Sequence, residues 1–254
     1  MLFPSDCRIC QTPLAGISAL PVCKRCLEKV VPLQGILCRV CGEKLFSQFV
    51  DTGEGPVCGL CRRAAPPFDR ALAFGAYDGP LRDLVHLLKY QRIHPVATLL
   101  GKLVGQALAE VELPESLVVI PVPLFKRKRR SRGFNQAEEI ARAFVRHSRA
   151  SGIELDTASL ARVRETTSQT GLTRHQRRAN VRGAFAVNRP ERMRDRSVLV
   201  VDDVMTTGTT AGECARVLKR VGARQVFVAT VARATREVEI HLEEPNAWAQ
   251  TAHA

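Results

Sequence analysis

The sequence predicts an α/β protein, in which a mostly parallel sheet with helices on both faces follows a small cysteine-rich module. Eight of the nine cysteines fall within the first 61 of 254 residues. After the double proline at Pro66 and Pro67, uniformly apolar segments alternate with segments whose apolar residues recur at helical spacing. We therefore expect a cysteine-rich domain over residues 1–65, an α/β domain over 66–238 and a loose tail over 239–254.

The α/β domain reads as strands and helices in turn. RALAFGAY predicts a strand, after which Asp78 caps a helix with Pro80 in its first turn, and a second helix starts at about Pro95. The later segments are the strand SLVVIPVP, the helix NQAEEIARAFVRHSRA, the strand SVLVVDD, a helix from about Gly208 to Val221 and the strand RQVFVATVAR. Buried strands alternating with amphipathic helices are typical of a parallel sheet covered on both faces.

The cysteines of the first module form four C-x-x-C pairs, and this regular spacing indicates two structural zinc sites. A thioredoxin-like redox site would need one such pair, and a reducing compartment disfavours structural disulfides. Pairing neighbours along the chain is the first interpretation, but a cross-braced arrangement would use the same residues. Two closed four-sulfur sites leave no open coordination position, so the zinc would be structural. The eight predicted ligands are Cys7, Cys10, Cys23, Cys26, Cys38, Cys41, Cys58 and Cys61.

Charge and hydropathy narrow the class of protein further. Residues 120–182 hold 15 Lys and Arg against 5 Asp and Glu, a net charge of +10 within a total of +13. Such a concentration suits phosphate-rich ligands or nucleic acid, although a basic run is often only a solvated surface. No apolar run approaches the length of a membrane span, and MLFPSDCRIC does not resemble a signal peptide, so we expect no membrane insertion and a cytoplasmic location.

The string SVLVVDDVMTTGTTAGE places two adjacent acids and a Thr/Gly loop at the end of a buried strand. In α/β sheets ligands bind beyond the carboxyl ends of the strands, where loops meet helix N-termini. The loop can present N–H groups and hydroxyls to a phosphate, while Asp202 and Asp203 are suited to accept hydrogen bonds from two sugar hydroxyls. The alternative is a turn capped by Asp203 before an ordinary helix.

VLVVDDVMTTGTT closely resembles the phosphoribosyl pyrophosphate (PRPP) motif of type I phosphoribosyltransferases. With IPVPLFKRKRRSRGFNQAEEIA and TSQTGLTRHQRRANVRGAF, the chain is similar to the ComF family over nearly residues 5–233. The resemblance implies a double zinc ribbon followed by a type I phosphoribosyltransferase-like domain that binds PRPP with Mg²⁺. It assigns the ribose hydroxyls to Asp202 and Asp203, and the 5-phosphate to Thr206, Thr207, Gly208, Thr209 and Thr210.

The same resemblance implies a pyrophosphate loop at IPVP, with Pro121, Val122 and Pro123, and the catalytic arginines Arg132 and Arg177. Gln169 and Asn180 would belong, with Arg177, to a flexible loop that closes over the reacting centre. The segment from about Arg164 to Phe185 has few large hydrophobes, which suits a mobile flap. The alternative for TRHQRRANV is a surface helix whose arginines face water.

Three functions remain open at this point. An enzyme would displace pyrophosphate from C1 of the sugar by a nitrogen nucleophile. Because Thr206 stands where purine-salvage relatives carry an Asp that assists the base, an ordinary purine acceptor is not expected. The family's association with natural competence indicates instead a PRPP- or nucleotide-responsive protein, or a scaffold, that binds single-stranded DNA and DNA-uptake proteins. In the third interpretation, the zinc module only mediates protein contacts for a small-molecule enzyme.

Overall fold

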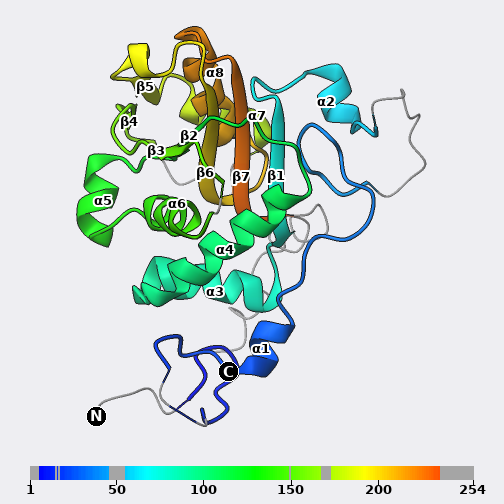
Figure 1. Ribbon diagram of the computed structural model, residues 1–254, viewed down its shortest axis with the longest axis vertical. Coiled ribbons are helices and arrows are strands. Elements are labelled where there is room, and N and C mark those ends of the chain that lie inside the picture. The colour runs from blue at the N-terminus through cyan, green and yellow to red at the C-terminus, as the bar shows by residue number, and fades with distance from the viewer. Residues whose placement is uncertain are drawn as a thin grey trace, which may run out of the picture.

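A computed structural model describes residues 6–14, 16, 18–45, 55–148, 150–166 and 173–234. Their centre is a five-stranded sheet with the strand order β1-β7-β6-β2-β3 (Figure 1). Every pairing within this sheet is parallel, which confirms the predicted sheet type. The strands are β1 (Arg70–Ala76), β2 (Leu117–Pro121), β3 (Ile153–Leu155), β6 (Ser197–Met205) and β7 (Gln225–Arg233).

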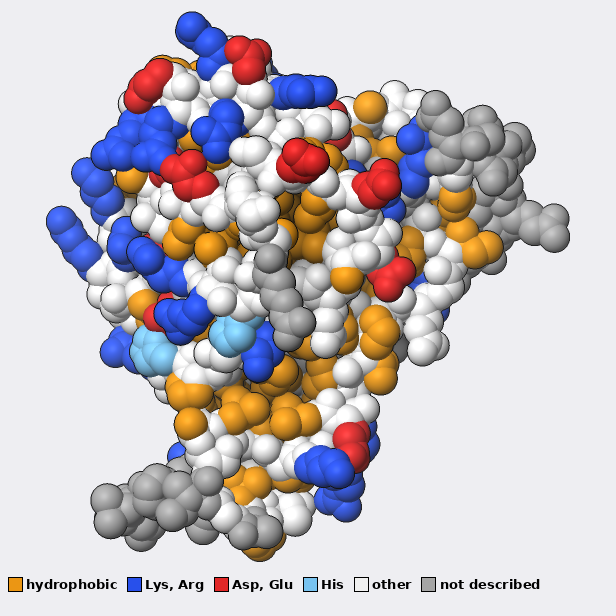
Figure 2. Space-filling model, viewed as in Figure 1, with side chains coloured by type: hydrophobic (Ala, Val, Ile, Leu, Met, Phe, Trp, Pro, Cys, Tyr) orange, Lys and Arg blue, Asp and Glu red, His pale blue; other side chains and the backbone are white. Residues whose placement is uncertain are grey.

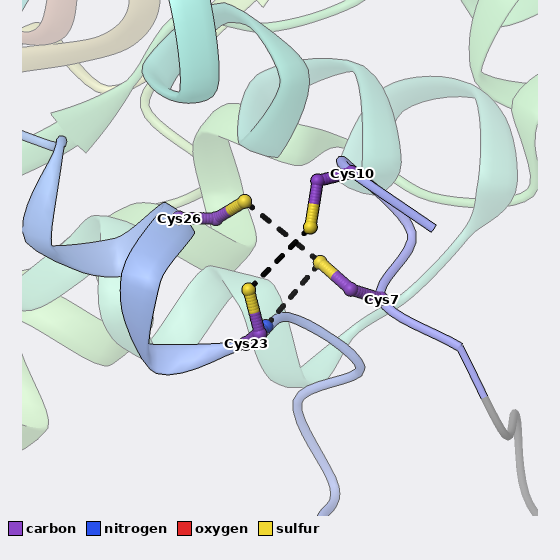
Figure 3. A group of neighbouring side chains, drawn as sticks. All are labelled: Cys7, Cys10, Cys23 and Cys26. Carbon is purple, nitrogen blue, oxygen red and sulfur yellow. Dashed lines mark hydrogen bonds between the residues drawn. The ribbon is translucent and has the colours of Figure 1, made fainter. Parts of the chain in front are cut away.

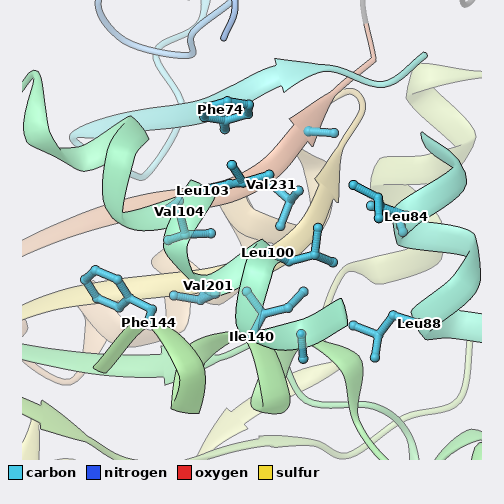
Figure 4. Close-up of a cluster of buried hydrophobic side chains, with 14 of the residues drawn as sticks. Phe74, Leu84, Leu88, Leu100, Leu103, Val104, Ile140, Phe144, Val201 and Val231 are labelled. Atoms are coloured by element: carbon cyan, nitrogen blue, oxygen red, sulfur yellow. The ribbon is translucent and has the colours of Figure 1, made fainter. Parts of the chain in front are cut away.

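Helices cover both faces of the sheet, as predicted. α3 (Gly79–Gln91), α4 (Pro95–Ala109) and α6 (Gln136–His147) lie on one face, and α8 (Thr209–Arg220) lies on the other. Figure 4 shows the apolar cluster on the first face, where Leu100 and Ile140 pack close to Val201 of β6. Gly101 lets α4 approach α6 closely, since a Cβ at this position would lie only 2.6 Å from the Cβ of Ala143.

The segment between α6 and β6 has more structure than its composition predicted. β4 (Leu160–Arg162) and β5 (Phe185–Val187) form an antiparallel hairpin, and α7 (Arg174–Val181) lies between them in the chain. Thr173 and Gln176 form a capping box that starts α7, and the helix packs against α8. The described part of the predicted flap is therefore a packed helix, because a local cap and α8 stabilise it without large hydrophobes.

The N-terminal module covers the free edge of β1. Leu33 N–H donates to the carbonyl of Phe74 at 2.7 Å, and Ala71 N–H donates to the carbonyl of Val40 at 2.8 Å. These bonds use backbone groups that an edge strand would otherwise expose. The module contains the short helices α1 (Lys24–Glu28) and α2 (Gly59–Arg63). It is therefore joined to the sheet along one strand.

Two further results bear on the predicted boundaries. β6 continues to Met205, two residues beyond the predicted end of the strand at Asp203, so both acids lie within the strand. The predicted tail over 239–254 lies outside the described residues. Among the helices that the structure describes, none combines the length and the apolar character needed to cross a bilayer.

Candidate functional site

The eight N-terminal cysteines form two groups of four, each made from neighbouring C-x-x-C pairs. In both groups the four Sγ atoms lie within 4.8 Å of one another. Figure 3 shows the first group, in which Cys7 and Cys26 are 3.9 Å apart and Cys10 and Cys23 are 3.6 Å apart. The structure thus has the sequential pairing and not the cross-braced one. The second group consists of Cys38, Cys41, Cys58 and Cys61.

The spacing of the sulfurs fits tetrahedral zinc. Zn–S bonds of about 2.3 Å place two sulfurs of one tetrahedron about 3.8 Å apart. The Sγ–Sγ separations of 3.9 Å and 3.6 Å in the first group, and of 3.8 Å between Cys41 and Cys58 in the second, match that value. Backbone N–H groups also point at the sulfurs, because Cys23 N lies 3.3 Å from Cys7 Sγ and Cys58 N lies 3.3 Å from Cys38 Sγ. Both groups could hold a zinc ion in a closed, structural site.

The two zinc groups are built alike, but they contact opposite faces of the sheet. Cys7 N–H donates to the carbonyl of Thr12 at 2.8 Å, and Cys38 N–H repeats this bond with Glu43 at 2.8 Å. The first group joins the apolar cluster beneath α3 and α4 through Cys7 and Cys26. The second packs against the cluster beneath α8. The module therefore consists of two similar ribbons, one packed against the apolar cluster on each face of the sheet.

Arg233, the last residue of β7, links the second zinc group to the sheet. It is only 2% exposed, and its Nη2 donates to Glu43 Oε2 at 2.5 Å and lies 3.8 Å from Cys41 Sγ. Its neighbour in the sheet register is Met205, at the end of β6. The second ribbon therefore lies at the carboxyl edge of the sheet, close to the predicted PRPP motif.

Asp202 and Asp203 point to opposite faces of β6, because successive residues on a strand alternate. Asp203 faces α3, where Lys89 Nζ lies 2.8 Å from its Oδ2. Asp202 faces the β4–β5 hairpin, where Arg162 is one of the cations that act on its charge. Asp202 Oδ1 also accepts a 2.9 Å bond from the N–H of Asp203. Burial, and then the charge of Asp203, raise the pKa of Asp202 to about 7.

The Thr/Gly loop turns directly from β6 into α8. Gly208 is the N-cap of α8 and has a φ of 72°, a left-handed conformation that favours glycine. It has no side chain to cap the helix, so the first N–H groups of α8 point toward the loop. The hydroxyls of Thr207 and Thr209 lie 2.6 Å apart in the same turn. This arrangement of N–H groups, hydroxyls and a helix N-terminus suits a phosphate.

The loop after β2 lies beside the acids. Val122 N–H donates to the carbonyl of Val201 at 2.8 Å, which holds the loop of Pro121, Val122 and Pro123 against β6. Asn135 is 6% exposed and fixes the loop from the other side, since its Nδ2 donates to the carbonyl of Val122 at 3.0 Å. Its Oδ1 accepts from Ala137 N–H and caps α6.

Arg177 reaches the Thr/Gly loop from α7. Its Nη1 donates to Thr206 Oγ1 at 3.2 Å, so it does not simply face water. Glu213 of α8 accepts a 2.6 Å bond from Gly183 N–H and thereby holds the end of this segment. Asn180 lies on the same helix, whereas Gln169 lies outside the described residues. The structure thus brings Arg177 to the predicted phosphate loop.

Arg132 ends α5 (Lys126–Arg132) and contacts different groups from Arg177. Its Nη1 donates to Gln136 Oε1 at 2.5 Å, and its guanidinium carbon lies 5.8 Å from the ring centroid of Tyr90. Lys128 of the same helix interacts electrostatically with Asp203. Desolvation and the charges of Arg132 and Arg162 lower the pKa of Lys128, and Asp203 opposes that shift.

Three cations that interact with the acids were not assigned to the site from the sequence. They are Lys89, Lys128 and Arg162. Lys89 left a signal, because it follows Val85 by one helical turn and so interrupts the apolar face of α3. Its pKa is raised: burial lowers it, but the charges of Asp203 and Asp202 outweigh that effect. Arg162 left no comparable signal, since only the folded chain brings its charge close enough to act on Asp202.

Comparisons with known proteins match the two halves of this chain separately. A double zinc ribbon model matches residues 1–68, and a phosphoribosyl transferase domain model matches residues 130–246. The DNA utilization protein YhgH of Escherichia coli K12 is 31% identical over 231 residues, which cover 89% of this chain and 95% of that protein. The chain belongs to the ComF family.

Competence protein F of Haemophilus influenzae, another relative of this ComF-family chain, is 33% identical over 189 residues. These cover 70% of this chain and 78% of that protein. Among solved structures, a glutamine PRPP amidotransferase from Bacillus subtilis matches with a TM-score of 0.37 and 24% identity. That match covers 54% of this ComF-family chain and 26% of the amidotransferase.

Proposed function

We propose that this chain binds PRPP with Mg²⁺ at the carboxyl end of β6 and transfers the phosphoribosyl group to a nitrogen acceptor. The observation that carries the proposal is the 3.2 Å contact between Arg177 Nη1 and Thr206 Oγ1. It places a cation at a loop whose glycine, hydroxyls and helix N-terminus already suit a phosphate. Two carboxylates lie on the same strand a few residues before that loop.

Each part of the ligand has candidate partners at this edge. Thr206 to Thr210 and the start of α8 would hold the 5-phosphate, and the carboxylates of Asp202 and Asp203 would accept hydrogen bonds from the ribose hydroxyls. The loop of Pro121, Val122 and Pro123 would lie along the pyrophosphate. Lys128 and Arg132 supply positive charge on that side, from helix α5.

In the transfer step the bond between C1 of the ribose and the pyrophosphate oxygen breaks, and a bond from C1 to the acceptor nitrogen forms. The bonding pair leaves with pyrophosphate, and the acceptor nitrogen gives its proton to solvent. Mg²⁺ bound with the ligand would neutralise part of the pyrophosphate charge. Arg177 and Arg132 would stabilise the charge that develops on the leaving group, so electrostatics and positioning supply the catalysis.

The test is the melting temperature of the zinc-loaded chain with and without PRPP and Mg²⁺. At about a hundred times the dissociation constant, the ligand should add roughly 2.7 kcal/mol to the unfolding free energy. An Asp202→Asn, Asp203→Asn double variant should gain little. Release of pyrophosphate in the presence of trial acceptors then tests the transfer step. Equal shifts in both proteins would place PRPP elsewhere, and no shift in either would remove the proposal.

A second candidate function is binding of single-stranded DNA, with PRPP or a nucleotide as a regulator. The names of the relatives, a competence protein and a DNA utilization protein, favour it. Helix α5 supports it, because its sequence KRKRRSR carries six cations and none of its residues is buried. Binding should weaken steeply with salt, and neutralising Lys126 to Arg130 should flatten that dependence. Affinity that responds to neither change would exclude this function.

The eight thiolates are best kept in a reducing compartment, so we place the protein in the cytoplasm. Fractionation of cells that express the native chain would test this placement, and recovery outside the cytoplasm would contradict it.

A further inference from the structure

Tyr90 is an exposed aromatic ring beside the basic helix α5. Its side chain is 67% exposed, although it follows the well-covered Lys89 on α3. The ring of His86 meets it edge-on, with centroids 5.2 Å apart and an interplanar angle of 89°. The guanidinium carbon of Arg132 lies 5.8 Å from its centroid. The ring is therefore oriented by two neighbours while most of its surface stays open to solvent.

Helix α5 is fixed next to this ring. Arg92, the C-cap of α3, donates from its Nη2 to the carbonyl of Ser131 at 3.2 Å and so joins the end of α3 to α5. Together with the contact between Arg132 and Tyr90, this bond holds the ring and the helix in one arrangement. Residues far apart in the sequence thus form one continuous surface.

The surface is strongly positive. Among the described residues, two of the six cations of α5 have carboxylate partners: Arg127 pairs with Glu165 at 2.6 Å and Arg129 with Glu138 at 3.5 Å. Lys126, Arg129, Arg130 and Gly133 line a shallow depression in it. In Figure 2 the Lys and Arg side chains gather on the left of the molecule, where α5 lies in Figure 1. The excess positive charge remains after both ion pairs are formed.

We propose that Tyr90 and helix α5 form a binding surface for single-stranded nucleic acid, in which a base stacks on the Tyr90 ring and the backbone phosphates lie along the cations of α5. The combination of an open aromatic ring with a row of cations matches the two chemical parts of such a strand. A duplex hides its base faces in the stack, so it can use the cations alone. An acidic peptide could pair with the cations, but its carboxylates would not stack on the Tyr90 ring.

This inference rests on the second candidate function and does not require phosphoribosyl transfer. It assigns the contact with a base to Tyr90, which lies on α3 and outside the basic run 126–132. Tyr90 also adjoins Lys89, which pairs with Asp203. The nucleic-acid surface and the proposed PRPP site therefore share one turn of α3.

The experiment measures fluorescence anisotropy of labelled strands with the zinc-loaded full chain. The probes are oligothymidylate, an abasic deoxyribose strand of equal length, oligouridylate, and a duplex that contains the thymidylate strand. The variants are Tyr90→Ala, Tyr90→Phe, which keeps the ring, and Arg129→Ala with Arg130→Ala. Lys102→Ala, an exposed cation on α4, is the matched control. Melting temperatures establish that each variant is folded.

Tyr90→Ala should weaken oligothymidylate binding by about 5- to 150-fold, the equivalent of one lost base–aromatic stack. Tyr90→Phe and Lys102→Ala should bind nearly as the native chain does. The abasic strand and the duplex should not respond to Tyr90→Ala. The double arginine variant should weaken all four probes and reduce the salt slope for the single strands by about 1.4, or roughly 0.7 for each lost contact.

Equal binding of oligothymidylate by the native chain and Tyr90→Ala would overturn the inference, and so would an equal loss on the abasic strand. Either result would leave the second candidate function intact, because the cations would still bind the backbone. A native chain that binds no strand would overturn both. Similar affinities for thymidylate and uridylate would support the surface as a general single-strand site. A preference between them would support it with discrimination by the sugar or by the thymine methyl group.

Discussion

The ammonium of Lys89 lies 2.8 Å from Oδ2 of Asp203, and this ion pair ties helix α3 to strand β6 at the carboxyl edge of the sheet. The side chains of Lys89 and Asp203 are 15% and 6% exposed, so water screens their attraction only weakly. Asp203 thus has a cation in direct contact, whereas burial and the neighbouring charge of Asp203 raise the pKa of Asp202. The adjacent acids therefore have different electrostatic environments although they are neighbours in the sequence.

Replacing Lys89 by Met should lower the unfolding free energy by about 3 kcal/mol, because it leaves the carboxylate of Asp203 buried without its cation. Adding Asp203→Asn should restore much of the loss, since the uncompensated charge is then removed. Urea denaturation of the zinc-loaded proteins measures both changes. Lys102→Met, on the exposed side of α4, is the control. A double variant as unstable as Lys89→Met alone would show that packing and not charge dominates.

Asp202 should make the stability depend on pH near neutrality. Its folded pKa of about 7 lies above the ordinary value for an aspartate, so the folded chain takes up this proton before the unfolded chain does. The contribution of Asp202 to stability therefore falls as the pH rises through 7. Between pH 6 and 8 the loss amounts to about 1.4 kcal/mol.

Asp202→Asn should remove this component. The quantity to measure is the difference in unfolding free energy between the native chain and the variant at pH 6, 7 and 8, in which effects of pH on the zinc sites largely cancel. A difference that stays constant over this range would mean that the pKa of Asp202 in the folded chain lies outside the range from 6 to 8.

Arg177→Met should weaken PRPP binding by about 10- to 100-fold, because a cation next to a bound phosphate contributes more than a neutral hydrogen bond. Its unfolding free energy should fall by no more than about 1 kcal/mol, the typical contribution of one hydrogen bond such as that to Thr206. Calorimetric titration with PRPP and Mg²⁺ measures the affinity. Arg178→Met, the exposed neighbour on α7, should bind as the native chain does. Equal losses in the two variants would indicate a general charge effect.

Metal analysis should find two zinc ions per native chain, one for each group of four cysteines. Cys10→Ser with Cys23→Ser, or Cys41→Ser with Cys58→Ser, should each reduce the content to one. Loss of the second site should also speed hydrogen exchange at the amide of Ala71, which is bonded to the carbonyl of Val40. Loss of the first site should leave that amide protected. Equal exchange at Ala71 in both variants would contradict the independence of the two ribbons.

Local patterns in the sequence predicted most of the fold. The buried strands, the helix begun by Asp78 and Pro80 and the helix that follows Gly208 all lie where apolar periodicity and end signals place them. The zinc ligands were equally readable, because two residues between thiolates is a constraint that the ion imposes on a short stretch of chain. Helix α7 was harder to predict, since its polar composition hid a capping box.

The candidate site likewise contains some residues that the sequence predicted and others that it did not. Asp202, Asp203 and the threonines of the loop could be predicted because they lie within nine residues of the chain, at the end of one strand and in the loop after it. Tyr90 could not be predicted, and Lys89 showed only as a break in the apolar face of α3, because nothing in that helix indicates which strand or helix will lie opposite. The sequential pairing of the cysteines was likewise open until the chain was folded.

The sequence by itself thus determined the four strands β1, β2, β6 and β7, the helices α3, α4, α6 and α8, the eight metal ligands and the chemistry of the β6 loop, since each depends on neighbours a few positions away. Only the tertiary structure decided that Arg177 meets Thr206, that Lys89 pairs with Asp203 and that Arg132 lies against Tyr90. The physical reason is that parallel strands bring their carboxyl ends to one edge through long connections. The residues that meet there are separated by tens of positions, and no local pattern records their contact.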